Sequence, residues 1–238
     1  MPADARALAA ALPDAPRWVQ TRALLLSGEA IIRRSAGADA AVVLDPVLPS
    51  GFLVGRADPA LLRDVAAAPR DVELVVQTEA IEEARAALAP GWRLATATLL
   101  ALVSPWPAAR DGGDPPAGVV ICAPPAEDWI ARVPEAGEMR FYAAQAEAIA
   151  LRLAGDEVVA VCAAGDVTES LWDVGIDTVE SHRRAGHAAE AFRALAGHMA
   201  AAGRQPVWCA EDDNVASLTM AARMGFVPVD RLGLLRRV

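Results

Sequence analysis

Two segments in the second half of the chain contain residues whose types and spacing could do chemistry. The first runs from Asp173 to Ala188, where a strand-like stretch leads into a turn with the pattern Arg183-x-x-Gly186-x-Ala188. Small residues let the backbone curl closely around a phosphate group, and the first amides of the following helix have no partner within that helix. An arginine at the rim can add charge-assisted hydrogen bonds. The segment therefore predicts a site for a pyrophosphate.

A purely structural explanation of this pattern stays open, in which Gly186 fits a tight helix start and the arginines are solvated. The turn is not a P-loop, which needs a Gly-Lys-Ser/Thr ending, and it is not a G-x-G-x-x-G dinucleotide fingerprint. The helix behind it has an apolar face formed by Ala188, Phe192, Leu195 and Met199. A strand, a turn and an amphipathic helix in this order favour the anion site.

The second segment runs from Val207 to Phe226. A strand-like stretch there meets an acidic turn, Asn214 begins a helix, and Gly225 ends it. Asn214 or Asp213 is expected to cap the helix, and Gly225 to adopt the left-handed conformation after it. Helix capping explains each feature alone, but their joint occurrence after the glycine turn indicates a larger motif.

Together, the two segments resemble the acetyl-CoA-binding and acceptor-side motifs of the GNAT superfamily of N-acetyltransferases, and are most similar to its glycine-N-acyltransferase-like branch. The resemblance covers residues 118–238 and is sharpest over 169–226. It implies a GNAT-like acyl-CoA N-acyltransferase fold, an α/β structure with a mixed sheet. It also implies direct transfer of an acetyl or other short acyl group. Acetyl-CoA or another acyl-CoA would be the co-substrate, and a small-molecule or peptide amine the acceptor.

The resemblance assigns roles to individual positions. Backbone groups that align the pantetheine arm and polarise the thioester fall on Ile176, Asp177 and Thr178, and the asparagine facing that arm falls on Asn214. The pyrophosphate turn covers seven residues, namely Arg183, Arg184, Ala185, Gly186, His187, Ala188 and Ala189. These positions are expectations for the structure to place.

The general base and acid are less well defined. Glu169, Asp173 and Asp177 would share one face of an unbroken strand, and the family geometry places a base near Asp173. A bulge near Gly175 would turn these side chains elsewhere, and a solvated strand face is the alternative. Asp173 is the expected base.

Many family members carry a tyrosine seven residues after the asparagine, to protonate the leaving thiolate. That position is Ala221 here, and the single tyrosine, Tyr142, lies in another segment. Ser217 is the substitute donor, with Thr219 as a second option, although a serine in the first turn of a helix is more often structural. The missing tyrosine keeps open a catalytically degenerate acyl-CoA-binding or regulatory module. A protein–protein adaptor is the third alternative.

Composition argues against several other classes. The formal net charge is −9 and the arginine pairs are isolated, so nucleic acid is not an expected partner. No CxxC pair occurs and the histidine spacing does not match zinc sites, so no metal is expected. No apolar run is long enough to span a membrane and no leader is visible, which predicts a cytoplasmic protein without a membrane partner. Homodimer formation is left open.

Around these segments, the chain reads as two domains. Residues 104–117 hold four prolines and two glycines, and are taken as a linker between a mixed α/β domain of unknown function (1–103) and the GNAT-like domain (118–238). In the first domain, helices are expected over 3–12, 16–34 and 78–88, and another is expected to begin at Asp58-Pro59, with Asp58 and Thr78 as caps. In the second, the expected order is β-α-α-β-β-β-α-β-α-β, with the two early helices over 127–133 and 139–147.

Overall fold

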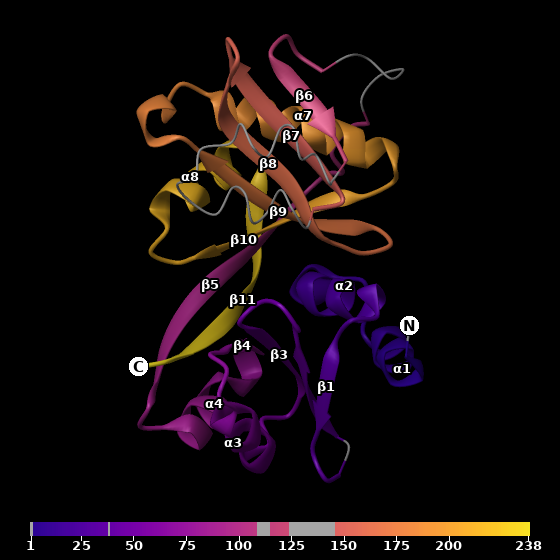
Figure 1. Cartoon of the computed structure of the whole chain (residues 1–238), viewed down its shortest axis with the longest axis vertical. Helices are drawn as coiled ribbons and strands as arrows, with labels where there is room; N and C mark the ends of the chain where they lie inside the picture. The colour runs from indigo at the N-terminus through magenta and orange to yellow at the C-terminus, as the bar shows by residue number, and fades with distance from the viewer. Residues whose placement is uncertain (1, 38, 109–114, 124–145) are drawn as a thin grey trace. The chain divides into compact units, whose positions relative to one another are not determined.

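The computed structural model describes residues 2–37, 39–108, 115–123 and 146–238 (Figure 1). The chain forms two compact units, one made of Met1–Leu100, Cys209–Thr219 and Pro228–Val238, the other of Ala101–Trp208 and Met220–Val227. The units follow contacts instead of chain order, because the chain returns twice to the first unit near its end. The domain boundary expected over 104–117 stays a prediction.

The first unit contains a mixed sheet with the strand order β1-β2-β3-β4-β11-β5. Its strands are β1 (Ile31–Arg34), β2 (Ala40–Leu44), β3 (Ser50–Gly55), β4 (Glu73–Gln77), β5 (Trp92–Leu102) and the later part of β11 (Phe226–Arg237). Its helices are α1 (Ala3–Ala11), α2 (Val19–Ser27), α3 (Pro59–Ala67) and α4 (Ile81–Leu88), with short 3₁₀ turns η1 (Pro16–Trp18) and η2 (Thr78–Ala80). Helices α3 and α4 pack together against a buried cluster that includes Leu53, Leu62 and Leu74.

The second unit contains a sheet with the order β10-β9-β8-β7-β6. Its elements are β6 (Val119–Cys122), β7 (Ala148–Ala154), β8 (Glu157–Val167), β9 (Leu171–Thr178), the 3₁₀ turn η4 (Glu180–His182), α7 (His187–Ala201) and β10 (Gln205–Glu211). Helix α8 (Val215–Arg223) follows β10 and contains residues of both units. Helix α7 lies across strands β6 to β9 (Figure 1).

Aromatic rings fill the space under α7. The Phe192 ring lies 5.2 Å from that of Trp106, 5.6 Å from that of Trp208 and 5.8 Å from that of Phe226, measured between centroids. Phe192 and Trp172 are both fully buried. Aromatic pairs at these separations add to the hydrophobic burial. Through Phe192, the cluster packs α7 against Trp172 of β9 and Trp208 of β10.

The two units have the same order and direction of strands and helices. In each, antiparallel strands come first, and then a helix crosses to a strand that runs parallel to the last of them. The crossover helix is α3 between β3 and β4, and α7 between β9 and β10. Both parallel pairs are short, extending over three residues from Ser50 opposite Glu73 in one and from Leu171 opposite Gln205 in the other. The first unit therefore repeats the topology of the second.

Several local expectations need correction. The helix predicted over 16–34 ends at Ser27, because Gly28 adopts a left-handed φ of 80°, and Ile31–Arg34 form strand β1. The β-branched residues of that stretch favour the strand. Thr78 does not cap α4; its hydroxyl donates instead to the Arg231 carbonyl at 2.7 Å. Except for residues 146 and 147, the helices predicted over 127–133 and 139–147 lie outside the described residues.

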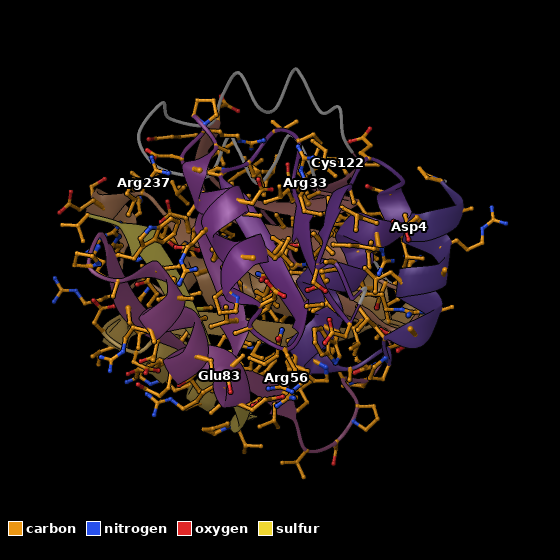
Figure 2. All side chains as sticks on the ribbon, turned by 90° about the horizontal axis from the view of Figure 1, so that it is seen from below. Asp4, Arg33, Arg56, Glu83, Cys122 and Arg237 are labelled. Carbon is orange, nitrogen blue, oxygen red and sulfur yellow. The ribbon has the colours of Figure 1, made fainter. Side chains whose placement is uncertain are left out.

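The expected cap of α3 is present. The carboxylate of Asp58 accepts a hydrogen bond from the Leu61 amide at 2.8 Å, which makes it the N-cap of α3. Asp4 of α1, labelled in Figure 2, accepts from the Arg34 side chain of β1 at 3.2 Å. Across the described parts of the chain, every helix is too short or too polar to cross a membrane.

Candidate functional site

The turn between β9 and α7 is open at the start of the helix. Gly186 is the N-cap residue and has a left-handed φ of 89°, a conformation that glycine adopts without strain. A Cβ atom added at this position would meet no atom within 4 Å. Because the N-cap has no side chain, it leaves the amides of His187, Ala188 and Ala189 at the positive end of the helix without a side-chain cap from that residue. This is the geometry expected of an anion site.

The arginines of the turn are arranged differently from one another. Arg183 folds back toward β9, where its Nε donates to the Thr178 carbonyl at 3.1 Å and its guanidinium lies 3.8 Å from the Asp177 carboxylate. Its side chain is still 58% exposed. Arg184 is exposed and has a left-handed φ of 66°. Sequence reasoning anticipated arginines at the rim but not the contact of Arg183 with the end of β9.

Strand β9 loses one neighbour halfway along its length. Its parallel pairing with β10 ends where Asp173 faces Val207, whereas β9 continues to Thr178 and stays paired with β8 on its other side. The positions predicted to face pantetheine, Ile176, Asp177 and Thr178, all lie in this one-sided stretch. Within the described strands, their β10 side has no ladder partner, so their backbone groups on that side can bind an extended ligand.

The predicted base lies at the point where the pairing ends. Asp173 is half-buried, and one of its carboxylate oxygens accepts from the Val174 amide at 3.1 Å. The sheet is irregular beside it, but not at Gly175 as considered from the sequence. The extra residue is in β8, between Ala164, which faces Val174, and Val167, which faces Trp172. The irregularity therefore lies directly opposite Asp173, where a bulge re-aims side chains.

Only two of the three carboxylates expected on one strand face are on the strand. Glu169 precedes β9, which begins at Leu171, whereas Asp173 and Asp177 are four residues apart on β9, and the extra residue of the irregularity is in β8, not between them. The Asp177 carboxylate also accepts from the Thr178 amide at 2.7 Å. The local turn at 168–171, which Thr168 stabilises by accepting from the Leu171 amide, removes Glu169 from the ladder.

Asn214 and Ser217 belong to the first unit and form the cap of α8. The side-chain oxygen of Asn214 accepts from the Ser217 amide at 3.1 Å, as the capping interpretation predicts. Gly225 ends the segment with a left-handed φ of 91°. Ala221, at the position where family members carry tyrosine, is fully buried. The capping role of Asn214 is thereby observed, whereas the donor of a proton to the leaving thiolate stays a prediction.

The acidic run after β10 is neutralised by arginines. Both oxygens of Glu211 accept from Arg236, at 2.7 and 2.9 Å, and Asp212 accepts from Thr98 at 2.6 Å and from Arg231. The hydrogen bonds from Arg236 lower the pKa of Glu211. Of the run, Asp213 remains exposed. These ion pairs were not found from the sequence.

The titratable groups do not gather in a metal-binding arrangement. Among the described residues, no three His, Cys, Asp or Glu side chains lie close enough together to hold an ion. The three cysteines are free thiols, and burial raises the pKa of Cys162. Two of the histidines, His182 and His187, lie beside each other at the turn with ring centroids 6.0 Å apart.

Comparison with known proteins bears on the same region. Residues 150–234 match the family model of the GNAT acetyltransferases, and this range spans β8, β9, the open turn, α7 and α8. The chain contains a GNAT domain. The expected superfamily is thereby confirmed, while its glycine-N-acyltransferase-like branch remains a prediction. No curated protein matches the chain.

Solved structures resemble the chain over nearly its whole length. A GCN5-related N-acetyltransferase-like protein from Streptococcus suis matches with a TM-score of 0.70 and 16% identity, covering 98% of each chain. A GNAT-family protein from Novosphingobium aromaticivorans matches with a TM-score of 0.66 and 19% identity, covering 94% of this chain and 98% of the other. A GCN5-related N-acetyltransferase from Kribbella flavida matches with a TM-score of 0.62 and 20% identity, covering 100% of this chain and 96% of the other. At these identities the matches establish the mixed α/β fold alone, and their coverage extends it over the first unit.

Proposed function

We propose that this chain is an N-acyltransferase that moves an acetyl or other short acyl group from acyl-CoA directly to an amine. The GNAT domain supports acyl transfer in general. The observation that carries the proposal is the open turn at the start of α7, joined to a strand whose last residues are paired on one side only. A helix start that accepts a pyrophosphate, next to backbone groups that accept an extended arm, fits the two parts of CoA.

The reaction can be written with the residues of β9. The pantetheine arm would lie along Ile176–Thr178, and backbone amides there would polarise the thioester carbonyl. The amine nitrogen attacks the carbonyl carbon, the carbon–sulfur bond breaks, and its electron pair leaves with the sulfur. The proton lost by the amine goes to Asp173. Holding both reactants in place contributes most of the rate, because the transfer becomes effectively unimolecular.

The leaving thiolate needs little assistance. A CoA thiolate is stable enough to depart as an anion or to take a proton from water, so acyl transfer does not require the missing tyrosine. Ser217 is the proposed donor within the chain. Its backbone amide is used by Asn214, which fixes its position in the first turn of α8.

Ligand binding is the first test. Thermal unfolding should shift upward with acetyl-CoA and with free CoA, because both bind the folded state, and should not shift with ATP at the same concentration. No shift with either CoA species would contradict the proposal.

Turnover is the second test, with an Asp173→Asn variant. Loss of the base should lower the rate of CoA release against a panel of amines by about 100-fold, with little change in the binding of acetyl-CoA. The matched control is Asp156→Asn, which changes an exposed aspartate just before β8, at the strand end far from the irregularity. An Asp173→Asn rate equal to that of the control would remove Asp173 from the mechanism. The chain contains no lysine, so acylation of its own side-chain amines cannot obscure the product.

One observation favours a second function, a non-catalytic acyl-CoA-binding module. Ala221 is fully buried, so the tyrosine position of the family is closed as well as empty of a phenol. Such a module would bind acetyl-CoA with a clear thermal shift. It would release no thiol and form no acylated amine with any acceptor in the panel.

A further inference from the structure

Strand β5 has a place in the sheet that the order of the chain does not predict. Strands β10 and β11 follow one another in the sequence with only α8 between them, yet in the sheet β5 lies between them (Figure 1). The family match covers residues 150–234, and β5, at Trp92–Leu102, lies outside it. Residues 209–211 at the end of β10, most of β5 and most of β11 belong to the first unit. The last two strands of the matched region are therefore neighbours of a strand that the match does not include.

Two threonines of β5 hold Asp212, the residue that follows β10. Thr96 and Thr98 are two positions apart on the strand, so their side chains share a face. The Thr96 hydroxyl donates to one oxygen of the Asp212 carboxylate, and the Thr98 hydroxyl donates to the other at 2.6 Å. The Asp212 amide donates to the Thr96 carbonyl at 2.9 Å. One strand therefore fixes both the backbone and the side chain of Asp212.

Arg231 binds the same carboxylate from β11, the strand on the other side of β5. Its guanidinium donates to Asp212 and, at 3.3 Å, to the Thr96 hydroxyl. Hydrogen bonds to an ionised carboxylate are stronger than those between neutral groups. The Asp212 side chain is only 28% exposed, and its three side-chain partners lie in the same unit. The position of Asp212 is therefore set by β5 and β11 together.

Asp212 lies two residues before Asn214 in a tight turn. The Asn214 amide donates to the Glu211 carbonyl at 2.9 Å, which closes the turn around Asp212 and Asp213. The side-chain oxygen of Asn214 accepts from the Ser217 amide, so its NH₂ group is the part that can donate to a ligand. The direction of that group depends on the turn, and the turn is anchored through Asp212.

We infer that Thr96 and Thr98 are positioning residues for CoA binding, because they hold Asp212 and through it the turn that presents Asn214 to the pantetheine arm. This inference rests on the proposed function and on the place that the resemblance gives to Asn214. It adds residues from outside the matched region, in the part of the chain (1–103) whose function the sequence leaves open. Without the threonine hydroxyls, the Asp212 carboxylate keeps one of its three side-chain partners. The turn then gains freedom, which weakens the contact of Asn214 with the ligand.

The test measures the affinity of the full chain for CoA by isothermal titration. Valine keeps the branched shape of threonine and removes the hydroxyl. The variant Thr96→Val/Thr98→Val therefore loses both hydrogen bonds to Asp212 with little change in strand propensity. We expect it to bind CoA about tenfold more weakly, because one hydrogen bond from Asn214 to the ligand is lost. Thr96→Ser/Thr98→Ser keeps both hydroxyls and should bind CoA as the wild type does.

Thr78→Val is the matched control. It removes a hydroxyl of the same unit that donates to the Arg231 carbonyl at 2.7 Å and not to Asp212. Urea unfolding should show a loss of stability in Thr78→Val and in the double valine variant, whereas CoA affinity should fall only in the double valine variant. An equal loss of affinity in Thr78→Val or in the double serine variant would overturn the inference, because general destabilisation or the lost methyl groups would then explain it.

A second background shows whether the threonines act through Asn214. In Asn214→Ala, the two valine substitutions should cause no further loss of affinity, because the contact that they weaken is already absent. A further loss of similar size there would overturn the inference. If the double valine variant fails to fold by circular dichroism, the single valine variants decide, each with an expected loss of about threefold. No CoA binding by the wild type contradicts the proposed function, whereas wild-type binding that the valine substitutions leave unchanged contradicts this inference alone.

Discussion

The two crossover turns of this chain have the same topology and opposite chemistry. In the first unit, Asp58 precedes α3, and its carboxylate accepts a hydrogen bond from the Leu61 amide at 2.8 Å. Pro59 follows it and has no N–H to offer. In the second unit, Gly186 precedes α7 and brings no side chain. A negative cap closes one helix start, and a glycine leaves the other open to an external anion.

The glycines of the two turns sharpen this contrast. Gly55, at the end of β3, has a φ of 85°, and a Cβ there would approach the Asp39 carbonyl to 2.4 Å. Gly186 has a similar φ of 89° with nothing within 4 Å. The same backbone conformation therefore serves tight packing in one unit and access in the other. The N-cap and its surroundings therefore make the helix start closed in the first crossover turn and open in the second.

The largest effect is expected when the second turn is given the chemistry of the first. Gly186→Asp places a carboxylate at the N-cap of α7, where it occupies the helix amides and repels a pyrophosphate. We expect CoA affinity to fall by at least about 100-fold, because like charges in contact cost several kcal/mol. Isothermal titration measures it.

The matched control for that change is Gly203→Asp. Gly203 also has a left-handed φ, of 79°, with open space around it, but follows the C-terminus of α7. It adds the same charge and backbone strain away from the turn. If both variants lose affinity equally, strain or net charge is responsible and the comparison between the turns fails.

A smaller effect is expected at Asn214. Asn214→Asp keeps an efficient N-cap for α8, so stability should change little, whereas Asn214→Ala should lose about 1 kcal/mol. If Asn214 also faces pantetheine, as the family resemblance implies, both variants should weaken CoA binding by about tenfold, since one hydrogen bond to the ligand is lost. Urea unfolding and titration of the two variants separate the roles. Unchanged affinity in Asn214→Asp would leave Asn214 as a cap alone.

A substitution in the first crossover turn should change the stability of the protein and leave CoA binding unchanged. Asp58→Ala removes the cap of α3 and should lower the free energy of unfolding by about 1 kcal/mol. CoA affinity should stay the same, because that turn is closed and lies in the other unit. A change in affinity or in the number of CoA molecules bound would show that the first turn also contributes a site.

The smallest expected effect is on the stability of the fold at low pH. Hydrogen bonds from Arg236 lower the pKa of Glu211; at Asp212, burial raises the pKa, but bonds from Thr96, Thr98 and Arg231 outweigh it. Carboxylates with a lowered folded-state pKa stabilise the fold above their unfolded value of about 4, and lose this as the pH falls below it. The urea midpoint should therefore drop between about pH 5 and 3. Glu211→Gln should reduce the drop in the free energy of unfolding by less than about 1 kcal/mol. Glu157 is exposed, and Glu157→Gln should leave the drop unchanged. Parallel curves for both variants would remove Glu211 from this account.

What the sequence predicted well was local. Gly186 before an amphipathic helix, Asp58 before Pro59 and Asn214 three residues before Ser217 define their caps within a few residues. The open turn could therefore be anticipated, and the comparison with known proteins confirmed the GNAT superfamily. Local capping rules act over single helical turns, which is why they can be applied without a structure.

What the sequence did not predict depends on distant partners. The Thr78 hydroxyl is used by Arg231, 153 residues away, and Asp212 is bonded to Thr98, 114 residues away. The sheet irregularity opposite Asp173 comes from register between strands, which neither strand encodes alone. The end of the helix at Gly28 was missed because Ile31 and Ile32 also continue a helical apolar pattern.

The most direct test of the open turn follows backbone amides by NMR as acetyl-CoA is titrated into the full chain. The account predicts that the amide resonances of Gly186, His187 and Ala188 shift strongly, while that of Leu61, which is bonded to Asp58, does not. Unmoved resonances at the second turn, together with binding detected elsewhere on the chain, would contradict it.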